Sequence, residues 1–344
     1  MFSFSYFKCA VFRVLCIIME KNIRTCLVIL GPTATGKTSL AVALANRFNA
    51  EIISADSRQV YRGLDIGSGK DLNEFTIKAQ DGTEHTVPYH LIDVTDLSTE
   101  YSVFNYQKDA YNVISDILAR GKSIVLVGGT GMYLDAVLRG YDMIDVPTNI
   151  QLRNSLNGVP DEELVKKLVA LKGNVHNTTD ITERHRLIRA IEIAEYENTT
   201  EAKAVRAQMV PRPKVDFFVI GLTFPRTRLR DGIRKRLIAR LDDGMLDEVQ
   251  HLHDCGVSFE RLERLGLEYR FCSEYLQGKF DSYETFVEKL YIAIGQFAKR
   301  QETWFRGMER KGCKINWLKT DEKTTKAEVF QKALELIQKN GIAL

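Results

Sequence analysis

Short hydrophobic runs alternate with helical patterns over the first 140 residues of the chain. Each run is five or six residues long, and two of the four are followed directly by glycine. Short runs of this kind are typical of strands buried on both faces of a parallel sheet. A strand, helix, strand order with short connections indicates right-handed parallel crossovers. We therefore predict an α/β fold with a parallel sheet flanked by helices. The expected strands are residues 25–30, 51–55, 90–94 and 123–127, and the expected helices are residues 37–48 and 104–120.

The pattern then becomes helical, and a strand returns only near residue 215. The clearest helices of this block are residues 161–171 and 182–196, whereas residues 215–222 and 314–318 are apolar strands. A helical block between strands of one sheet predicts an inserted all-helical domain. The expected division is an N-terminal extension at 1–23, the α/β core at 24–141, the insertion at 142–212, a mostly helical second part of the core at 213–320 and a C-terminal helix at 321–344.

Charge and composition bear on two questions, whether the protein binds nucleic acid and whether it spans a membrane. The 344 residues include 48 Lys and Arg against 45 Asp and Glu, a net charge of +3, which neither predicts nor excludes a nucleic-acid partner. The most apolar N-terminal stretch is interrupted by Lys8 and Arg13, so we expect no membrane span and a cytoplasmic protein. Met19 is an alternative start, and residues 1–18 are then dispensable.

The first strand is followed by the phosphate-loop pattern G-x-x-x-x-G-K-S/T. Its glycines allow backbone N–H groups to surround phosphate oxygens, Lys37 adds a positive charge, and the Thr38 hydroxyl is suited to Mg²⁺. The pattern predicts a polyphosphate ligand without saying which one. A GTPase would show an N-K-x-D motif, which is absent, whereas a nucleotide kinase remains an alternative. The loop consists of Gly31, Pro32, Thr33, Ala34, Thr35, Gly36, Lys37 and Thr38.

Two more loops end strands at the same edge of the predicted sheet, where ligands of open parallel sheets bind. Asp56 follows the second strand, and it is either a proton acceptor or the N-cap of a helix. Gly128, Gly129 and Gly131 surround Thr130, whose hydroxyl can donate to a phosphate oxygen, although a tight turn explains the glycines equally well.

Basic residues at helical spacing form the last candidate feature. Within residues 226–240, Arg236 and Arg240 fall on or beside the apolar stripe, and an inward-facing arginine needs an anion partner. A carboxylate and a bound diphosphate are equally compatible with that need. Arg186 and Arg189 belong to a second basic cluster, for which a solvated helix face is the default interpretation.

Taken together, these segments resemble the tRNA dimethylallyltransferase family, also called isopentenyl-diphosphate:tRNA transferases, from about residue 25 to 318. The resemblance implies a P-loop NTPase-like core with a helical insertion on the tRNA. It also implies transfer of a dimethylallyl group from its diphosphate to N6 of adenosine 37, with Mg²⁺ as the cofactor. One departure is that residues 67–71 read G-S-G-K-D where the family commonly has G-T-A-K-P. The matching motifs are residues 31–38, 53–67, 90–93, 127–131, 186–192 and 299–304.

The resemblance also implies roles for individual residues. Asp56 would be the general base or hydrogen-bond acceptor at adenine N6, and Thr130 and Arg236 would join Lys37 and Thr38 in holding the diphosphate. We expect a monomer that binds dimethylallyl diphosphate and the anticodon stem-loop of tRNA. The alternatives are an adenylate isopentenyltransferase acting on a free nucleotide, a P-loop nucleotide or small-molecule kinase and a non-catalytic tRNA-binding relative. The expected tRNA contacts are Ser57, Arg58, Gln59, Arg186 and Arg189.

Overall fold

The computed structural model describes residues 24–78, 81–173 and 183–344, so the expected extension at 1–23 lies outside the described residues. The chain forms two compact units. One combines Met1–Gly140 with Arg212–Leu344, and the other is Tyr141–Pro211. The second unit matches the expected insertion to within one residue at each end.

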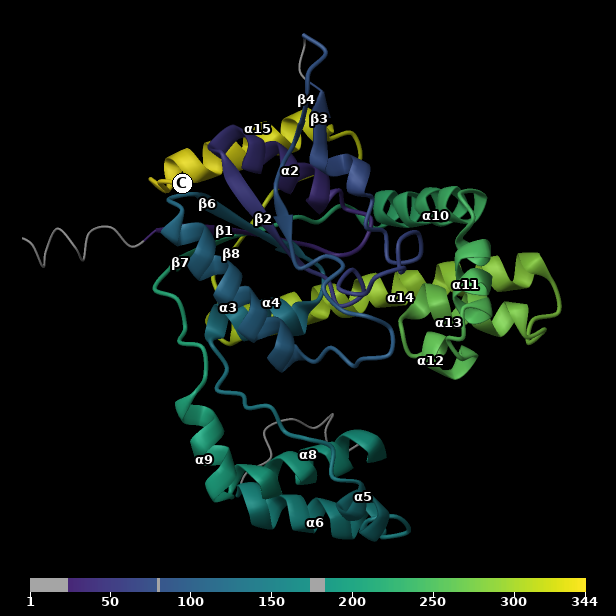
Figure 1. Ribbon diagram of the computed structural model, residues 1–344. Coiled ribbons are helices and arrows are strands. Elements are labelled where there is room, and N and C mark those ends of the chain that lie inside the picture. The colour runs from purple at the N-terminus through teal and green to yellow at the C-terminus, as the bar shows by residue number, and fades with distance from the viewer. Residues whose placement is uncertain (1–23, 79–80, 174–182) are drawn as a thin grey trace, which may run out of the picture. The chain divides into compact units, whose positions relative to one another are not determined.

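The first unit is built on a six-stranded parallel sheet in the order β5-β2-β6-β1-β7-β8 (Figure 1). Gly128 at the end of β6 pairs with both Leu30 and Ala55, so β1, β2 and β6 end level with one another. The loops that follow these strands therefore meet at one edge. The strands are β1 (Thr25–Leu30), β2 (Ala50–Ala55), β5 (Tyr89–His90), β6 (Ser123–Gly128), β7 (Asp216–Gly221) and β8 (Ile315–Trp317).

Helices cover both faces of this sheet. On one face, α2 (Lys37–Phe48) and α15 (Lys326–Lys339) pack their apolar sides onto β1, β2, β6 and β7, with Leu44 and Ala333 fully buried. The other face carries α3 (Val103–Ala119), α4 (Gly131–Arg139) and the long α14 (Tyr283–Arg310) (Figure 1). Because both faces are covered, the central strands are mostly apolar, as the sequence pattern predicted.

A second core in the same unit lies among the C-terminal helices. Its helices are α10 (Arg226–Asp242), α11 (Met245–Asp254), α12 (Phe259–Glu263) and α13 (Leu267–Leu276), which pack against α14. Val60 and Leu64 from the segment after β2 are fully buried in this core. The packing therefore anchors that segment at the end of the sheet.

The second unit is helical, as expected. It contains α5 (Ile150–Ser155), α6 (Asp161–Lys172), α8 (Arg184–Glu197) and α9 (Thr200–Ala207). Leu164 and Leu168 of α6 pack against Leu187 and Ile191 of α8 in a separate apolar core. None of the helices in the described ranges is both long and apolar enough to cross a membrane.

Two local expectations were wrong. The strand expected at 90–94 ends at His90, because Leu91 and Asp93 adopt left-handed φ angles of 62° and 56°, which no strand tolerates. A short antiparallel hairpin was not predicted, since its strands β3 (Thr76–Lys78) and β4 (Glu84–Thr86) are polar and only three residues long. The other strands begin and end within one residue of the predicted bounds.

Candidate functional site

The phosphate-loop residues connect β1 to α2 in the conformation that their sequence predicts. Gly36 has φ 74° and Ala34 has φ 62°, so the chain turns twice through left-handed geometry before the helix begins. The Thr35 hydroxyl is buried and donates to the carbonyl of Pro32 at 2.8 Å, which ties the loop to itself. Gly36 has no side chain to cap α2, so the first N–H groups of the helix stay available to an anion.

Lys37 occupies an environment that disfavours its charge. Burial, and after it the nearby positive charge of Arg236, lower the pKa of Lys37 to about 8. Among the described residues, its ammonium group has one hydrogen-bond acceptor, the carbonyl of Pro32, at a long 3.4 Å. A bound anion would restore the protonated form.

Gln301 on α14 joins the phosphate loop to the loop after β6. Its Oε1 accepts from the backbone N–H of Thr33 at 2.9 Å, and its Nε2 donates to the carbonyl of Gly129 at 2.8 Å. A Cβ on Gly129 would lie 2.5 Å from that Nε2, so the contact depends on glycine. Gln301 lies within the matching motif at residues 299–304, but the sequence assigned it no role of its own.

Asp56 and Thr130 lie beside each other at the ends of β2 and β6. Asp56 Oδ1 accepts from the N–H of Arg58 at 2.9 Å, and turns follow Asp56, so the helix N-cap interpretation is wrong. The Thr130 hydroxyl accepts from the N–H of Ser57 at 3.0 Å. The Thr130 hydroxyl donates a long 3.4 Å hydrogen bond to Ser57 Oγ, which a ligand oxygen could replace, and the second carboxylate oxygen of Asp56 can face the same ligand.

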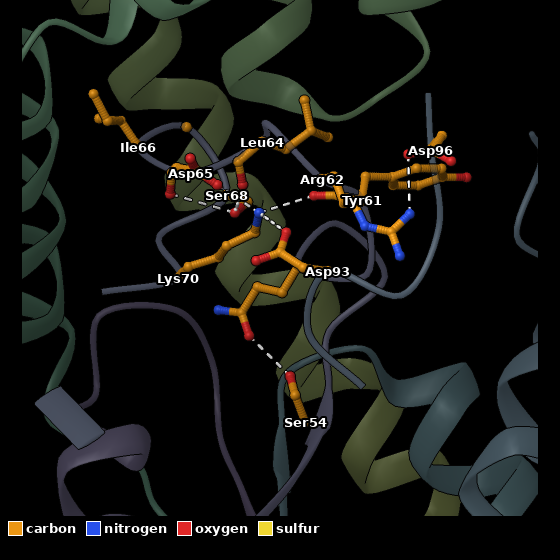
Figure 2. A network of polar contacts seen from close by, with 12 residues as sticks. Ser54, Tyr61, Arg62, Leu64, Asp65, Ile66, Ser68, Lys70, Asp93 and Asp96 are labelled. Atoms are coloured by element: carbon orange, nitrogen blue, oxygen red, sulfur yellow. Dashed lines mark hydrogen bonds and ion pairs between the residues drawn. The ribbon is translucent and has the colours of Figure 1, made fainter. Parts of the chain in front are cut away.

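The segment after this turn folds back over the sheet edge and is fixed by Lys70 (Figure 2). The Lys70 side chain is 1% exposed and donates to the carbonyl of Tyr61 at 2.9 Å, to Asp65 at 2.5 Å and to Asp93. Gln59 Nε2 donates to the carbonyl of Gly69 at 2.9 Å. Since the amide of Gln59 is engaged in this way, it holds the segment in place.

Glu248 and Tyr269 fix the same segment from the helical side. Glu248 accepts from three consecutive backbone N–H groups, those of Asp65, Ile66 and Gly67, at 3.0, 2.6 and 3.1 Å. The Tyr269 hydroxyl donates to Glu248 at 2.7 Å and accepts from the N–H of Ser68 at 3.1 Å. Sequence reasoning missed both residues, because they follow this segment by about 180 and 200 positions.

Arg236 and Arg240 face inward from α10, as their position beside the apolar stripe predicted. Arg236 pairs with Asp71 at 2.7 Å, while Arg240 lies 4.0 Å from Asp71 and 3.9 Å from Glu268. Burial lowers the pKa of Arg240 and raises that of Glu268. The anion that pairs with Arg236 in this structure is thus a carboxylate. Gly69 is pressed against both arginines, and a Cβ there would lie 1.6 Å from Arg240 Nη2.

These elements enclose a cavity of about 340 Å³ at the carboxyl ends of the strands. A second cavity, of about 1140 Å³, lies between α2, α10 and α15 and shares Lys37, Thr38 and Arg236 with the first. Gly31 and Pro32 line neither cavity and instead form the turn out of β1. The expected site residues in the first cavity are Thr33, Lys37, Thr38, Asp56, Ser57, Arg58, Gln59, Thr130 and Arg236.

The donor set of the first cavity fits Mg²⁺ held together with phosphate. Mg²⁺ usually takes one or two protein oxygens plus substrate phosphates and water. The Thr38 hydroxyl and the Asp56 carboxylate line the same cavity and supply such oxygens. Within the described ranges there is no cluster of three or more His, Cys, Asp or Glu side chains that would hold a metal without a ligand.

Two of the three arginines expected to contact tRNA, Arg186 and Arg189, belong to the second unit and differ in their surroundings. Arg189 donates to Glu192 at 2.5 Å and to the carbonyl of Val146 at 2.7 Å, and Glu192 is 1% exposed. Arg186 is exposed, with no ion pair among the described residues. Arg189 therefore stabilises α8 within its unit, whereas the guanidinium of Arg186 faces solvent.

Comparison with known proteins gives consistent results. The IPP transferase family model matches residues 59–308, and the isopentenyl transferase model matches residues 24–80. A tRNA dimethylallyltransferase from Treponema denticola is 52% identical over 85% of this chain and 94% of its own length. One from Geotalea uraniireducens is 47% identical over 92% of this chain and 98% of its own length.

A solved structure is similar over nearly the whole chain. The full-length tRNA isopentenylpyrophosphate transferase from Bacillus halodurans superposes with a TM-score of 0.62 and 31% identity. The match covers 92% of this chain and 96% of that one.

Proposed function

Because the chain belongs to the IPP transferase family, we propose that it transfers the dimethylallyl group of dimethylallyl diphosphate to N6 of adenosine 37 in tRNA. The observation that supports this most directly is one cavity lined by Lys37, Thr38, Asp56 and Thr130. It combines groups suited to a diphosphate with a carboxylate suited to an amine. A P-loop kinase could use the same groups, since its carboxylate accepts the proton of a hydroxyl substrate, so it is the family assignment that favours prenyl transfer.

In the proposed reaction, the adenine N6 amine attacks C1 of the dimethylallyl group while the C–O bond to the diphosphate breaks. The proton released from N6 passes to the Asp56 carboxylate, and the electron pair of the C–O bond leaves with the diphosphate. Lys37, Arg236 and the Thr130 hydroxyl stabilise the negative charge that develops there. Mg²⁺, held through Thr38, would supply further charge neutralisation.

The acceptor is proposed to be tRNA, bound through Arg58 at the cavity and Arg186 in the second unit. Ser57, Gln59 and Arg189 remain predicted tRNA contacts, although each also has a partner within the protein. A free nucleotide requires only a pocket, so a separate helical unit supports tRNA over the adenylate alternative. We further propose a cytoplasmic monomer.

The test is incubation with labelled dimethylallyl diphosphate and bulk tRNA that lacks the modification. We expect label in tRNA and in an anticodon stem-loop with adenosine at position 37, and none when that adenosine is replaced. Asp56→Asn keeps an oxygen for the N–H of Arg58, and it should lower kcat by about 10²–10⁴-fold without changing donor binding. Prenylation of AMP without tRNA activity would favour the adenylate enzyme. Binding of ATP far tighter than the donor would favour the kinase.

A further inference from the structure

Asp71 places a carboxylate directly on the cations of the proposed donor site. It follows Lys70 in the left-handed region, with φ 45°, and begins a short 3₁₀ turn at Leu72–Phe75. Its Oδ2 lies 2.7 Å from Arg236 and 4.0 Å from Arg240. Asp71 also lines the second cavity together with Lys37 and Thr38. A side chain of this protein thus occupies Arg236, which is proposed to bind the diphosphate.

The cations around Asp71 have more capacity for negative charge than the protein supplies. The Nε of Arg240 is buried and has no hydrogen-bond partner among the described residues. Burial and neighbouring arginines lower the pKa of Lys37, which indicates that its charge is poorly compensated. A diphosphate carries more charge and more acceptor oxygens than one carboxylate, and it can satisfy donors that Asp71 leaves unused.

Asp71 is positioned so that it can be displaced without disturbing the fold. The preceding residue, Lys70, is anchored by Tyr61 and Asp65, which keeps the backbone of Asp71 beside α10. The Asp71 side chain itself is 44% exposed, so water can solvate its carboxylate once Arg236 turns to a ligand. The backbone around Asp71 therefore stays in place when a ligand replaces the Asp71 carboxylate at Arg236.

We propose that Asp71 is an internal anion that occupies Arg236 in the ligand-free site and is exchanged for the diphosphate of the donor. It is an affinity-setting residue that does not touch the reacting atoms. Its carboxylate weakens the binding of both the diphosphate group of the donor and the pyrophosphate product, and so favours product release. The proposal rests on the donor site proposed above.

The direct test is the affinity for inorganic pyrophosphate with Mg²⁺, measured by calorimetry on the full chain without tRNA. Asp71→Asn keeps a residue that tolerates left-handed geometry and removes the charge. We expect it to bind pyrophosphate about three- to tenfold more tightly than the unmodified protein, the effect of removing one partly exposed competing charge. The same variant should show a lower KM for the donor and stronger inhibition by pyrophosphate.

Two further variants separate this exchange from other effects. Glu74→Gln removes a carboxylate that lines the same second cavity and has no ion pair among the described residues, so it should change the affinity by less than twofold. In an Arg236→Ala background, Asp71→Asn should have no effect. Weaker or unchanged binding by Asp71→Asn, an equal gain from Glu74→Gln, or a gain that persists without Arg236 would each overturn the proposal.

The donor site itself is checked separately by Lys37→Ala. If pyrophosphate binds the unmodified protein and Lys37→Ala abolishes that binding, the donor site stands and Asp71→Asn decides the exchange alone. If the unmodified protein does not bind pyrophosphate, the donor site and the exchange both fail. Thermal melting without ligand, compared among the variants, shows whether any change in affinity comes from unfolding.

Discussion

Lys37 shows how one residue makes the proposed donor site sensitive to pH. An ordinary exposed lysine keeps its proton up to about pH 10. Burial and the charge of Arg236 lower the pKa of Lys37 to about 8 in the ligand-free protein. A diphosphate at the same place favours the charged form and raises that pKa again. Binding above pH 8 is therefore coupled to the uptake of a proton.

We predict that pyrophosphate affinity is highest below pH 8 and falls as the pH rises through and above that value. The loss should approach tenfold per pH unit, because one proton must be taken up on binding. Titration calorimetry at several pH values measures it. Lys37→Arg provides the control, since its guanidinium stays charged throughout this range, so its profile should keep only the ionisation of pyrophosphate itself and lose the steep fall. A profile that is equally steep in both proteins would exclude Lys37 as the group responsible.

At this scale the sequence predicted which residues line the site better than it predicted their partners. Asp56, Thr130 and Lys37 were expected at one sheet edge because parallel strands end together, and the cavity contains all three. The hydrogen bond from Ser57 to Thr130 spans 73 positions, and nothing in the local pattern indicates it. The pairing of Arg236 with Asp71 was left open for the same reason.

At the scale of elements, hydrophobic runs predicted the long strands. The polar contacts that fix the loop segments were not predicted. β1, β2 and β6 are buried on both faces, so their sequences are mostly apolar. The segment that carries Lys70 is fixed mainly by polar contacts with distant residues such as Glu248. Such contacts leave no periodic pattern, which explains why this part of the site was recognised only in three dimensions.

Helix α14 contributes Gln301, whose amide connects the phosphate loop to the loop after β6. We predict that Gln301→Ala lowers the free energy of unfolding by about 2 kcal/mol, because it leaves two buried backbone groups without partners. It should also reduce kcat/KM for the donor by about tenfold or more, through displacement of the phosphate loop. Denaturant unfolding and steady-state kinetics measure these effects. Thr303→Ala on the exposed side of α14 is the control, and equal behaviour of both variants would exclude the connecting role.

On the scale of the whole molecule, the chain consists of two units with separate cores. The first cavity, which is proposed to bind the donor, lies entirely within the first unit, because that unit contains every residue that lines it. The second unit has its own apolar core and carries Arg186 and Arg189, two of the three arginines expected to contact tRNA. Changes on the surface of the second unit should therefore affect the acceptor and leave donor binding unchanged.

Arg186 and Arg189 allow this separation to be tested, since only Arg189 is bound to a buried carboxylate. We predict that Arg186→Ala raises the KM for tRNA severalfold and lowers the slope of log affinity against log salt by about one, the effect of one lost phosphate contact. Its melting temperature and its KM for the donor should not change. Arg189→Ala should in addition destabilise the second unit, because Glu192 then keeps only Arg153 as its ionic partner. Filter binding at several salt concentrations and thermal melting distinguish the two variants. An unchanged salt slope in Arg186→Ala would show that this face of α8 does not contact the tRNA backbone.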